Sequence, residues 1–132
     1  MAVASWHDGE YEHGIMTVET TEDLDHALSA VLAVRTPLGH PTLTVVHDED
    51  NALTVATDGS RAMLVHFIGT DGDYRNSMGG TADGNAFVFD YQGHWSEAAP
   101  ESVVTLDAAK DALVTFLRTG RPTPSAVQFD RT

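Results

Sequence analysis

Two segments of the chain repeat apolar residues with the period of an α-helix. The first follows Thr20-Thr21-Glu22-Asp23, where a threonine side chain can cap the free backbone N–H groups of a helix start. Its apolar residues fall at i, i+3, i+4, i+7 and i+8, namely Leu24, Ala27, Leu28, Val31 and Leu32. Because Pro37 follows, we predict a helix that ends before this proline.

A second helix is predicted over residues 107–119, where the same spacing recurs. Its apolar stripe consists of Ala109, Ala112, Leu113, Phe116 and Leu117. Gly120 is placed to adopt the left-handed conformation that ends many helices, and Pro122 prevents the helix from continuing.

The remaining apolar segments are typical of β-strands. Residues 42–47 and 52–57 flank the polar tetrapeptide 48–51 (DEDN), which suits a hairpin turn, and Asp58-Gly59-Ser60 suits the next turn before a strand over 61–68. A strand over 86–92 places Phe87, Phe89 and Tyr91 on one face and Val88 on the other. Short strands are predicted near residues 15–18 and 126–129.

Strands gathered between two separated helices predict an α+β fold. We expect one domain over residues 1–132, with an antiparallel sheet of about five to seven strands packed on one face by both helices. Residues 69–85, between the third and fourth strands, are predicted to form a loop. A loop of this length is usually functional or disordered. Tyr74 and Arg75 near its middle are residue types favoured at binding hot spots.

The charge of the chain bears on its partners. Twenty acidic residues against seven Lys and Arg give a formal net charge of −13, and within residues 1–60 Arg35 is the only Lys or Arg. Nucleic acid is not expected as a direct partner, because phosphate contacts require clustered Lys and Arg. Two interpretations stay open: recognition of a cationic partner, or simple solubility in a salty or GC-rich cellular background.

The composition also limits chemistry and location. The chain has no Cys, which excludes disulfides and thiolate metal sites and fits a reducing cytosol. The first ten residues lack the basic and apolar regions of a signal peptide, and no apolar run approaches the ~20 residues of a membrane-spanning helix. We therefore expect a cytoplasmic protein without membrane contact.

The candidate metal sites lack the required ligand spacing. The run from His7 to His13 is rich in His, Asp and Glu, but its glycines and lack of a helical i, i+4 pair favour a solvated N-terminal segment. The runs that begin at Asp48 and Asp71 resemble the start of a calcium loop, yet each lacks the fifth ligand and the final glutamate. No metal and no cofactor are expected.

The sequence contains few residues in arrangements that indicate catalysis. There is no Gly-x-Ser-x-Gly, no Cys nucleophile and no glycine-rich phosphate loop. Glu97 and Glu101 form a carboxylate pair of a kind that any acidic chain contains. His66 lies inside an apolar strand and is predicted to be a satisfied core histidine, whereas His47 and His94, at strand ends, are predicted to face solvent. We predict that the chain is not an enzyme.

The C-terminal third resembles a known family. An aromatic strand and a Gly-His-Trp turn span residues 87–97, a helix ends in Thr119-Gly120-Arg121-Pro122, and Val127-Gln128-Phe129 follows. Trp95 in the turn either closes the edge of the core or belongs to an exposed aromatic and acidic patch. These segments resemble the first-numbered family of immunity proteins from bacterial polymorphic-toxin systems. The chain departs from that family at Phe129, where Trp is expected, at residues 96–99, and in a central segment without Trp.

The resemblance implies an antitoxin that binds a cognate toxin, with nucleic-acid-modifying enzymes such as cytidine deaminases, which hold zinc, prominent among the targets. An acidic chain can cover the basic substrate groove of such an enzyme. The residues predicted to bind this cationic partner are Asp48, Glu49 and Asp50 in one turn, Asp71, Asp73 and Tyr74 in the long loop, and Tyr91, His94, Trp95 and Glu97. The alternatives are a small-ligand or regulatory α+β domain, and an acidic hydrolase of unrecognised type.

Overall fold

Both predicted helices form, and both begin and end for local reasons. This computed structural model describes residues 2–7, 12–69, 72–79, 87–91 and 94–130. Helix α1 (Thr21–Ala33) starts at a capping box, in which Thr20 Oγ1 accepts from the Asp23 N–H at 3.1 Å and the Asp23 carboxylate accepts from the Thr20 N–H. Helix α2 (Leu106–Thr119) ends at Gly120, whose φ of 78° is left-handed as predicted.

The strands form a large sheet and a separate hairpin. In chain order they are β1 (Ala2–His7), β2 (Glu12–Val18), β3 (Leu43–Asp48), β4 (Asn51–Thr57), β5 (Arg61–Ile68), β6 (Asp73–Met78), β7 (Phe87–Tyr91), β8 (His94–Ala98), β9 (Val104–Thr105) and β10 (Gln128–Phe129), with a short 3₁₀ helix, η1 (Pro100–Ser102). Among the described residues, eight strands make the antiparallel main sheet, in the order β10-β6-β5-β4-β3-β1-β2 with β9 beside β5. The predicted α+β class is confirmed.

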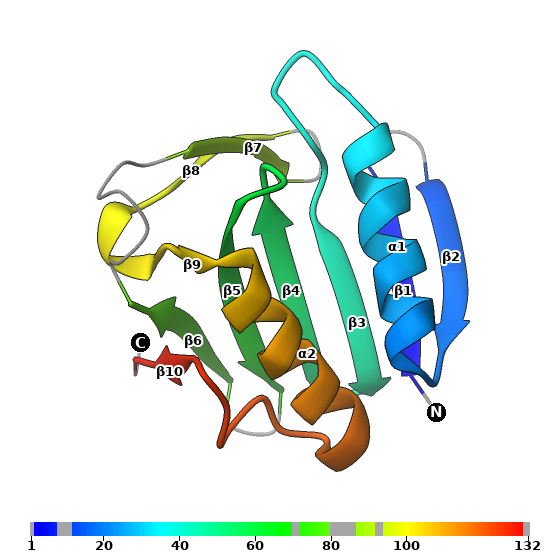
Figure 1. Cartoon of the computed structure of the whole chain (residues 1–132), viewed down its shortest axis with the longest axis vertical. Helices are drawn as coiled ribbons and strands as arrows, with labels where there is room; N and C mark the ends of the chain where they lie inside the picture. Colours follow the sequence, from blue (N-terminus) through cyan, green and yellow to red (C-terminus); the bar gives the residue numbers. More distant parts are fainter. Residues whose placement is uncertain (1, 8–11, 70–71, 80–86, 92–93, 131–132) are drawn as a thin grey trace.

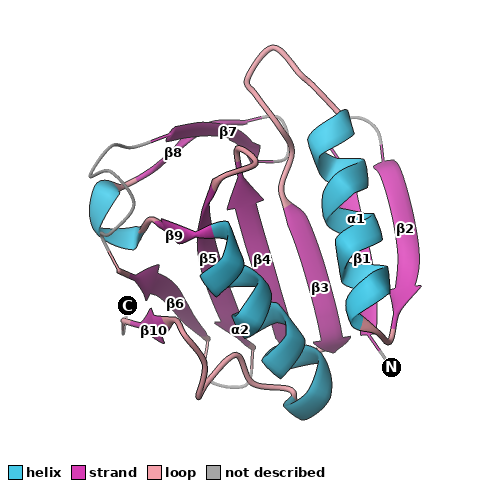
Figure 2. Cartoon of the chain, in the orientation of Figure 1, coloured by secondary structure: helices cyan, strands magenta, loops and turns pink. Residues whose placement is uncertain are grey.

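Both helices cover the same face of the main sheet, the face toward the viewer in Figures 1 and 2. The core between them is apolar: Leu24, Leu28 and Val31 of α1 and Leu113 and Phe116 of α2 are buried together with the inward residues of the sheet. Each inward residue alternates with an outward one, as the period of a strand requires.

The N-terminal segment was predicted incorrectly in part. Strand β1 lies inside the sheet, between β3 and β2, and Trp6 is buried against Gly14 of the neighbouring strand. Its inward residues Ala2 and Ala4 are small, which made the alternation weak in sequence. Residues 8–11 of the polar run lie outside the described residues.

The segment 69–85 was also predicted incorrectly in part, because β6 lies within it. This strand pairs with β5 through Val65↔Asn76 and Phe67↔Tyr74. Its inward residues Arg75 and Ser77 are polar, so its sequence shows no apolar alternation. Hydrogen bonds to residues distant in the chain stabilise this strand instead: Ser77 Oγ donates to Ser102 O at 2.7 Å and accepts from Leu64 N.

Strand β7 does not continue the main meander. It pairs with β8, and the resulting hairpin lies across one end of the main sheet (Figure 1), with a small core of Ala56, Phe87, Phe89, Ala98 and Val103. As predicted, Phe87 and Phe89 share a buried side and Val88 is exposed.

The turn between β4 and β5 is stabilised by the carboxylate of Asp58. Asp58 accepts from the Ser60 and Arg61 N–H groups and pairs with the Arg61 guanidinium at 2.8 Å. Partial burial opposes the charge, but these hydrogen bonds outweigh it and lower the pKa of Asp58 from 3.8 to about 2. The resulting stability is therefore present above pH 4 and is lost as the pH falls through about 2.

We expect Asp58→Asn to lower the free energy of unfolding by about 1 kcal/mol at neutral pH. Urea denaturation of both proteins across the acidic range measures this. The difference between them should shrink below pH 4; a difference that stays constant down to pH 2 would show that the carboxylate charge is not involved.

Candidate functional site

The predicted acidic turn forms an exposed hairpin tip. Asp48, Glu49 and Asp50, named the acidic tip below, connect β3 to β4, and all three are exposed. Asp48 Oδ1 accepts from the Asp50 N–H at 2.9 Å, which holds the turn in shape and leaves the Glu49 and Asp50 side chains free to project. This position for the acidic tip agrees with the sequence prediction.

The β5–β6 connection packs directly against the acidic tip. The Gly69 N–H donates to Asp50 O at 2.7 Å, and a Cβ on Gly69 would lie 2.8 Å from Asp50 Oδ1 and 3.2 Å from Asp50 Cα, so a larger residue would require the Asp50 side chain to turn away and the two turns to separate slightly. Two hairpin ends therefore meet at one end of the sheet. Asp71, predicted to bind the partner, lies outside the described residues.

Asp73 and Tyr74, predicted as neighbours in a loop, point to opposite faces of the sheet because they are consecutive residues of β6. Asp73 faces the helix side and pairs with Arg75 at 3.3 Å. Tyr74 faces the other side, with its ring 4.9 Å from that of Phe67. The structure therefore places these two predicted residues on different faces of the sheet.

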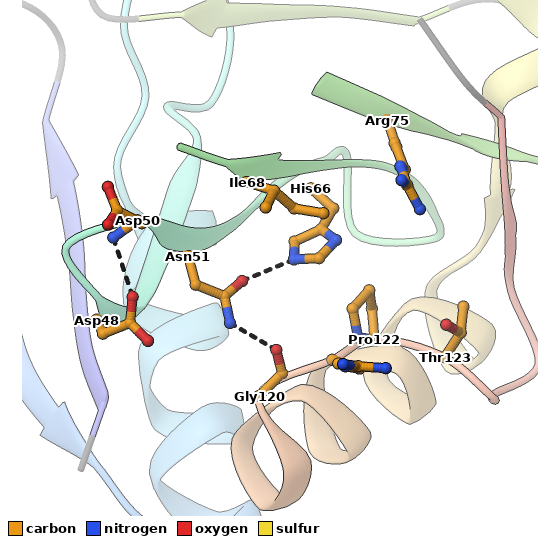
Figure 3. Close-up of a pocket in the computed structure, with 10 residues that line it drawn as sticks. Asp48, Asp50, Asn51, His66, Ile68, Arg75, Gly120, Pro122 and Thr123 are labelled. Atoms are coloured by element: carbon orange, nitrogen blue, oxygen red, sulfur yellow. Dashed lines mark hydrogen bonds between the residues drawn. The ribbon is translucent and has the colours of Figure 1, made fainter. Parts of the chain in front are cut away.

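A cavity of about 620 Å³ opens between these hairpin ends and the C-terminal end of α2 (Figure 3). We name it the end cavity. Its lining residues are Asp48, Asp50, Asn51, His66, Ile68, Arg75, Gly120, Arg121, Pro122 and Thr123. Two carboxylates and two guanidinium groups thus line one space, so the end cavity suits a polar or charged group of a partner.

Asn51 fixes the geometry of the cavity floor. Its Nδ2 donates to Gly120 O at 2.6 Å, and its Oδ1 lies 2.7 Å from His66 Nε2. Since the carbonyl of Gly120 only accepts, the amide oxygen of Asn51 must face His66, and His66 Nε2 must carry the hydrogen. The floor therefore links β4, β5 and the end of α2.

His66 is buried, as predicted, and satisfied by Asn51. Its ring also lies edge-on to Phe116, with the centroids 5.7 Å apart. Burial lowers the pKa of His66 below its usual value, and the positive charge of Arg75 lowers it further. The folded chain therefore holds this imidazole neutral where an unfolded chain would take up a proton.

This difference in pKa between the folded and the unfolded chain predicts that acid lowers the folding stability at pH values above those at which carboxylates become protonated. As the pH falls through 6.5, His66 should become protonated in the unfolded chain first, so folding stability falls. His66→Gln keeps an N–H donor for Asn51 but does not titrate. Denaturation at about pH 7.5 and about pH 5.5 should show a larger loss for the wild type than for H66Q. Equal losses would contradict this assignment.

The basic residues of the end cavity were not predicted as site residues. Arg75 is partly buried, and its Nε has no hydrogen-bond partner among the described residues. Arg121 is exposed on the opposite wall. The segment Thr119-Gly120-Arg121-Pro122 was interpreted as a helix end, and that motif was the available signal: the structure places Gly120, Arg121 and Pro122 in the cavity wall.

His47 was predicted to face solvent, but its side chain is only 32% exposed. Its ring packs edge-on against Phe116, with a centroid separation of 5.8 Å, and lies beside Gly120. The reason is the register of β3, in which position 47 alternates onto the helix side of the sheet. Phe116 therefore supports both His47 and His66 beneath the end cavity.

The second group of predicted residues lies elsewhere. Tyr91, His94, Trp95 and Glu97 belong to the β7–β8 hairpin, at the opposite end of the main sheet from the acidic tip (Figure 1). Trp95 is 60% exposed, so it does not close the edge of the core. By the register of the hairpin, Trp95 and the exposed Glu97 lie on one of its faces, whereas the exposed Tyr91 and His94 lie on the other.

Two further observations concern metals and membranes. In the described part of the chain, no three His, Asp or Glu side chains gather as they would around a metal ion. Neither helix of the described residues is long and apolar enough to cross a membrane.

Fold and site together define a small acidic α+β domain whose exposed hairpins and charged end cavity suit contact with another macromolecule. Residues 12–130 match the sequence model of a family described as Immunity protein Imm1, and the chain belongs to this family. The family relationship suggested by residues 87–129 is therefore confirmed, and it extends over most of the chain. No curated protein matches the sequence.

Proposed function

We propose that this chain is a cytoplasmic antitoxin that binds a cationic, nucleic-acid-modifying toxin, such as a zinc-dependent cytidine deaminase, and covers its basic substrate groove. The family supports an immunity role and a toxin partner. The observation that carries the finer proposal is the exposed acidic tip beside the end cavity, on a chain of net charge −13. Opposite charge accelerates the encounter of the two proteins. It would also place carboxylates at the positions where the toxin binds the phosphates of its substrate.

The end cavity would give this contact its specificity. Glu49 and Asp50 would meet the rim of the basic groove, while one side chain of the toxin enters the cavity. Arg75 and Arg121 suit a carboxylate, and Asp48 and Asp50 suit a cation. Inhibition is then stoichiometric and steric, and this chain performs no catalysis.

Isolation of the partner at two ionic strengths tests the proposal. Tagged protein should retain a basic partner with an enzymatic domain from lysate that contains expressed toxins, and retain less of it at high salt. The purified partner domain must then lose its activity on nucleic acid when one equivalent of this chain is added. A partner that stays fully active in the complex would refute occlusion of the substrate groove.

A second candidate function is favoured by the size of the end cavity. Its volume of about 620 Å³ is that of a small-ligand site. A regulatory domain that binds a polar small molecule would retain no protein partner at either salt concentration. A ligand-induced rise in melting temperature that disappears in Arg75→Gln would support this alternative.

A further inference from the structure

The face of the main sheet opposite the helices is uncharged over a wide area. Twelve outward positions with described side chains form it, two from each of six strands, and we name them the uncharged face: Val3, Ser5, Ile15, Thr17, Thr44, Val46, Ala52, Thr54, Val65, Phe67, Tyr74 and Asn76. Of 27 charged residues in the chain, none occupies these positions.

The orientation follows from burial and register. The residues that alternate with these twelve, such as Ala4, Val45, Leu53 and Leu64, belong to the core beneath the helices. The uncharged face itself is open: Ile15 is 62% exposed and Tyr74 52%. The β7–β8 hairpin covers the adjoining part of the same side, where Phe87 and Phe89 pack against Ala56 and Met63.

The uncharged face is also already ordered for contact. Thr44 and Thr54 hydrogen-bond to each other through their hydroxyl groups at 3.1 Å, so covering them costs little polar desolvation. The rings of Phe67 and Tyr74 contact each other across β5 and β6, with an angle of 37° between their planes, and present one aromatic surface. Seven of the twelve residues of the uncharged face are apolar or aromatic, and exposed surfaces that combine such residues with uncharged polar ones suit association with another protein.

We propose that the uncharged face is the contact between two copies of this chain. A cationic toxin would be recognised through acids, and this face offers none. Two copies of a chain of charge −13 repel each other, and they can approach most closely where neither presents charge. The nearby charged residues lie at its edges: the acidic tip at one end, Asp130, whose carboxylate accepts from the backbone of Asn76, and Arg61, whose guanidinium lies over the ring of Phe87 in the β7–β8 hairpin.

The size of the uncharged face determines the affinity expected for the dimer. Six strands span five spacings of about 4.8 Å, so the face is roughly 24 Å wide. Twelve residues are fewer than the roughly 20–30 that each partner contributes to a standard interface, which predicts a reversible dimer with a dissociation constant on the order of 10 µM. Salt should strengthen it by screening the acids, the opposite of its effect on toxin binding.

Sedimentation equilibrium on the full chain, from about 1 µM to about 1 mM, tests this. The mass should rise from 14.2 kDa toward twice that value, and it should rise further at high salt. Val46→Lys, and independently Ile15→Lys, should weaken dimerisation at least about tenfold, because each dimer would bury two lysines. Unchanged urea denaturation shows that the variants fold.

Val88→Lys is the matched control, since it makes the same change at an exposed strand valine outside the uncharged face. It should leave the dimer intact. A monomer at every concentration and salt would overturn the proposal. So would a monomeric chain whose toxin binding is lost in V46K, because the face would then belong to the toxin. The test needs no toxin, so its failure leaves the proposed function untouched.

Discussion

Replacing Phe116 with alanine is expected to lower the free energy of unfolding by about 3–5 kcal/mol, because it empties a fully packed position of the core. Phe116 is fully buried, and its ring supports His47 and His66 from below. Its loss removes apolar contacts and opens a void beneath the end cavity, into which water can reach two imidazoles. For a chain of this length, the melting temperature should fall by roughly 10–20 °C.

Thermal and urea denaturation measure this effect, with Phe116→Leu as the control. Leucine retains most of the apolar volume, so F116L should cost no more than about 1.5 kcal/mol. If F116A and F116L cost the same small amount, the ring is not the support of the cavity floor. Loss of toxin binding in F116A at a temperature where it stays folded would further show that the floor positions the cavity residues.

Reversing the charge of Glu49 and Asp50 together is expected to raise the dissociation constant for the toxin about 10- to 100-fold. Neither side chain holds the turn, since the turn-forming carboxylate is that of Asp48 and it accepts from the Asp50 backbone. The variant should therefore fold normally. Most of the loss should appear in the association rate, and the dependence of affinity on salt should become flatter.

Stopped-flow or surface-based kinetics at several ionic strengths measure this. Glu97→Lys/Glu101→Lys makes the same change in net charge on β8 and η1, near the opposite end of the molecule. Normal binding by E97K/E101K and impaired binding by E49K/D50K would place the toxin at the acidic tip. The reverse pattern would transfer the interface to the β7–β8 hairpin and its exposed Trp95.

The elements with strong local signals were predicted correctly from sequence. The capping residues and apolar stripes located both helices, and Gly120 ended α2 as expected because only a left-handed residue fits there. Strands β3, β4 and β5 followed from runs of apolar and β-branched residues bounded by polar turns. The family relationship was likewise readable from residues 87–129, because motifs at helix ends and turns are local.

The site was predicted only in part, since its residues are far apart in the chain. The acidic tip was found because a turn is a local feature. The end cavity was missed because Asn51, His66, Arg75 and Arg121 meet only when β4, β5, β6 and the end of α2 come together. Whether the predicted residues share one surface could not be derived from sequence, and the structure places the acidic tip and the β7–β8 hairpin at opposite ends of the sheet.

The sequence by itself determined the α+β class, the two helices, the acidic character and the family. The tertiary structure alone decided that β1 lies inside the sheet, that β6 exists, and that β7 leaves the meander for β8. Each of these depends on pairing between distant strands, whose hydrogen bonds and buried neighbours compensate for weak local patterns. The same pairing gathers the outward residues of six strands into the uncharged face, which no segment of the sequence reveals by itself.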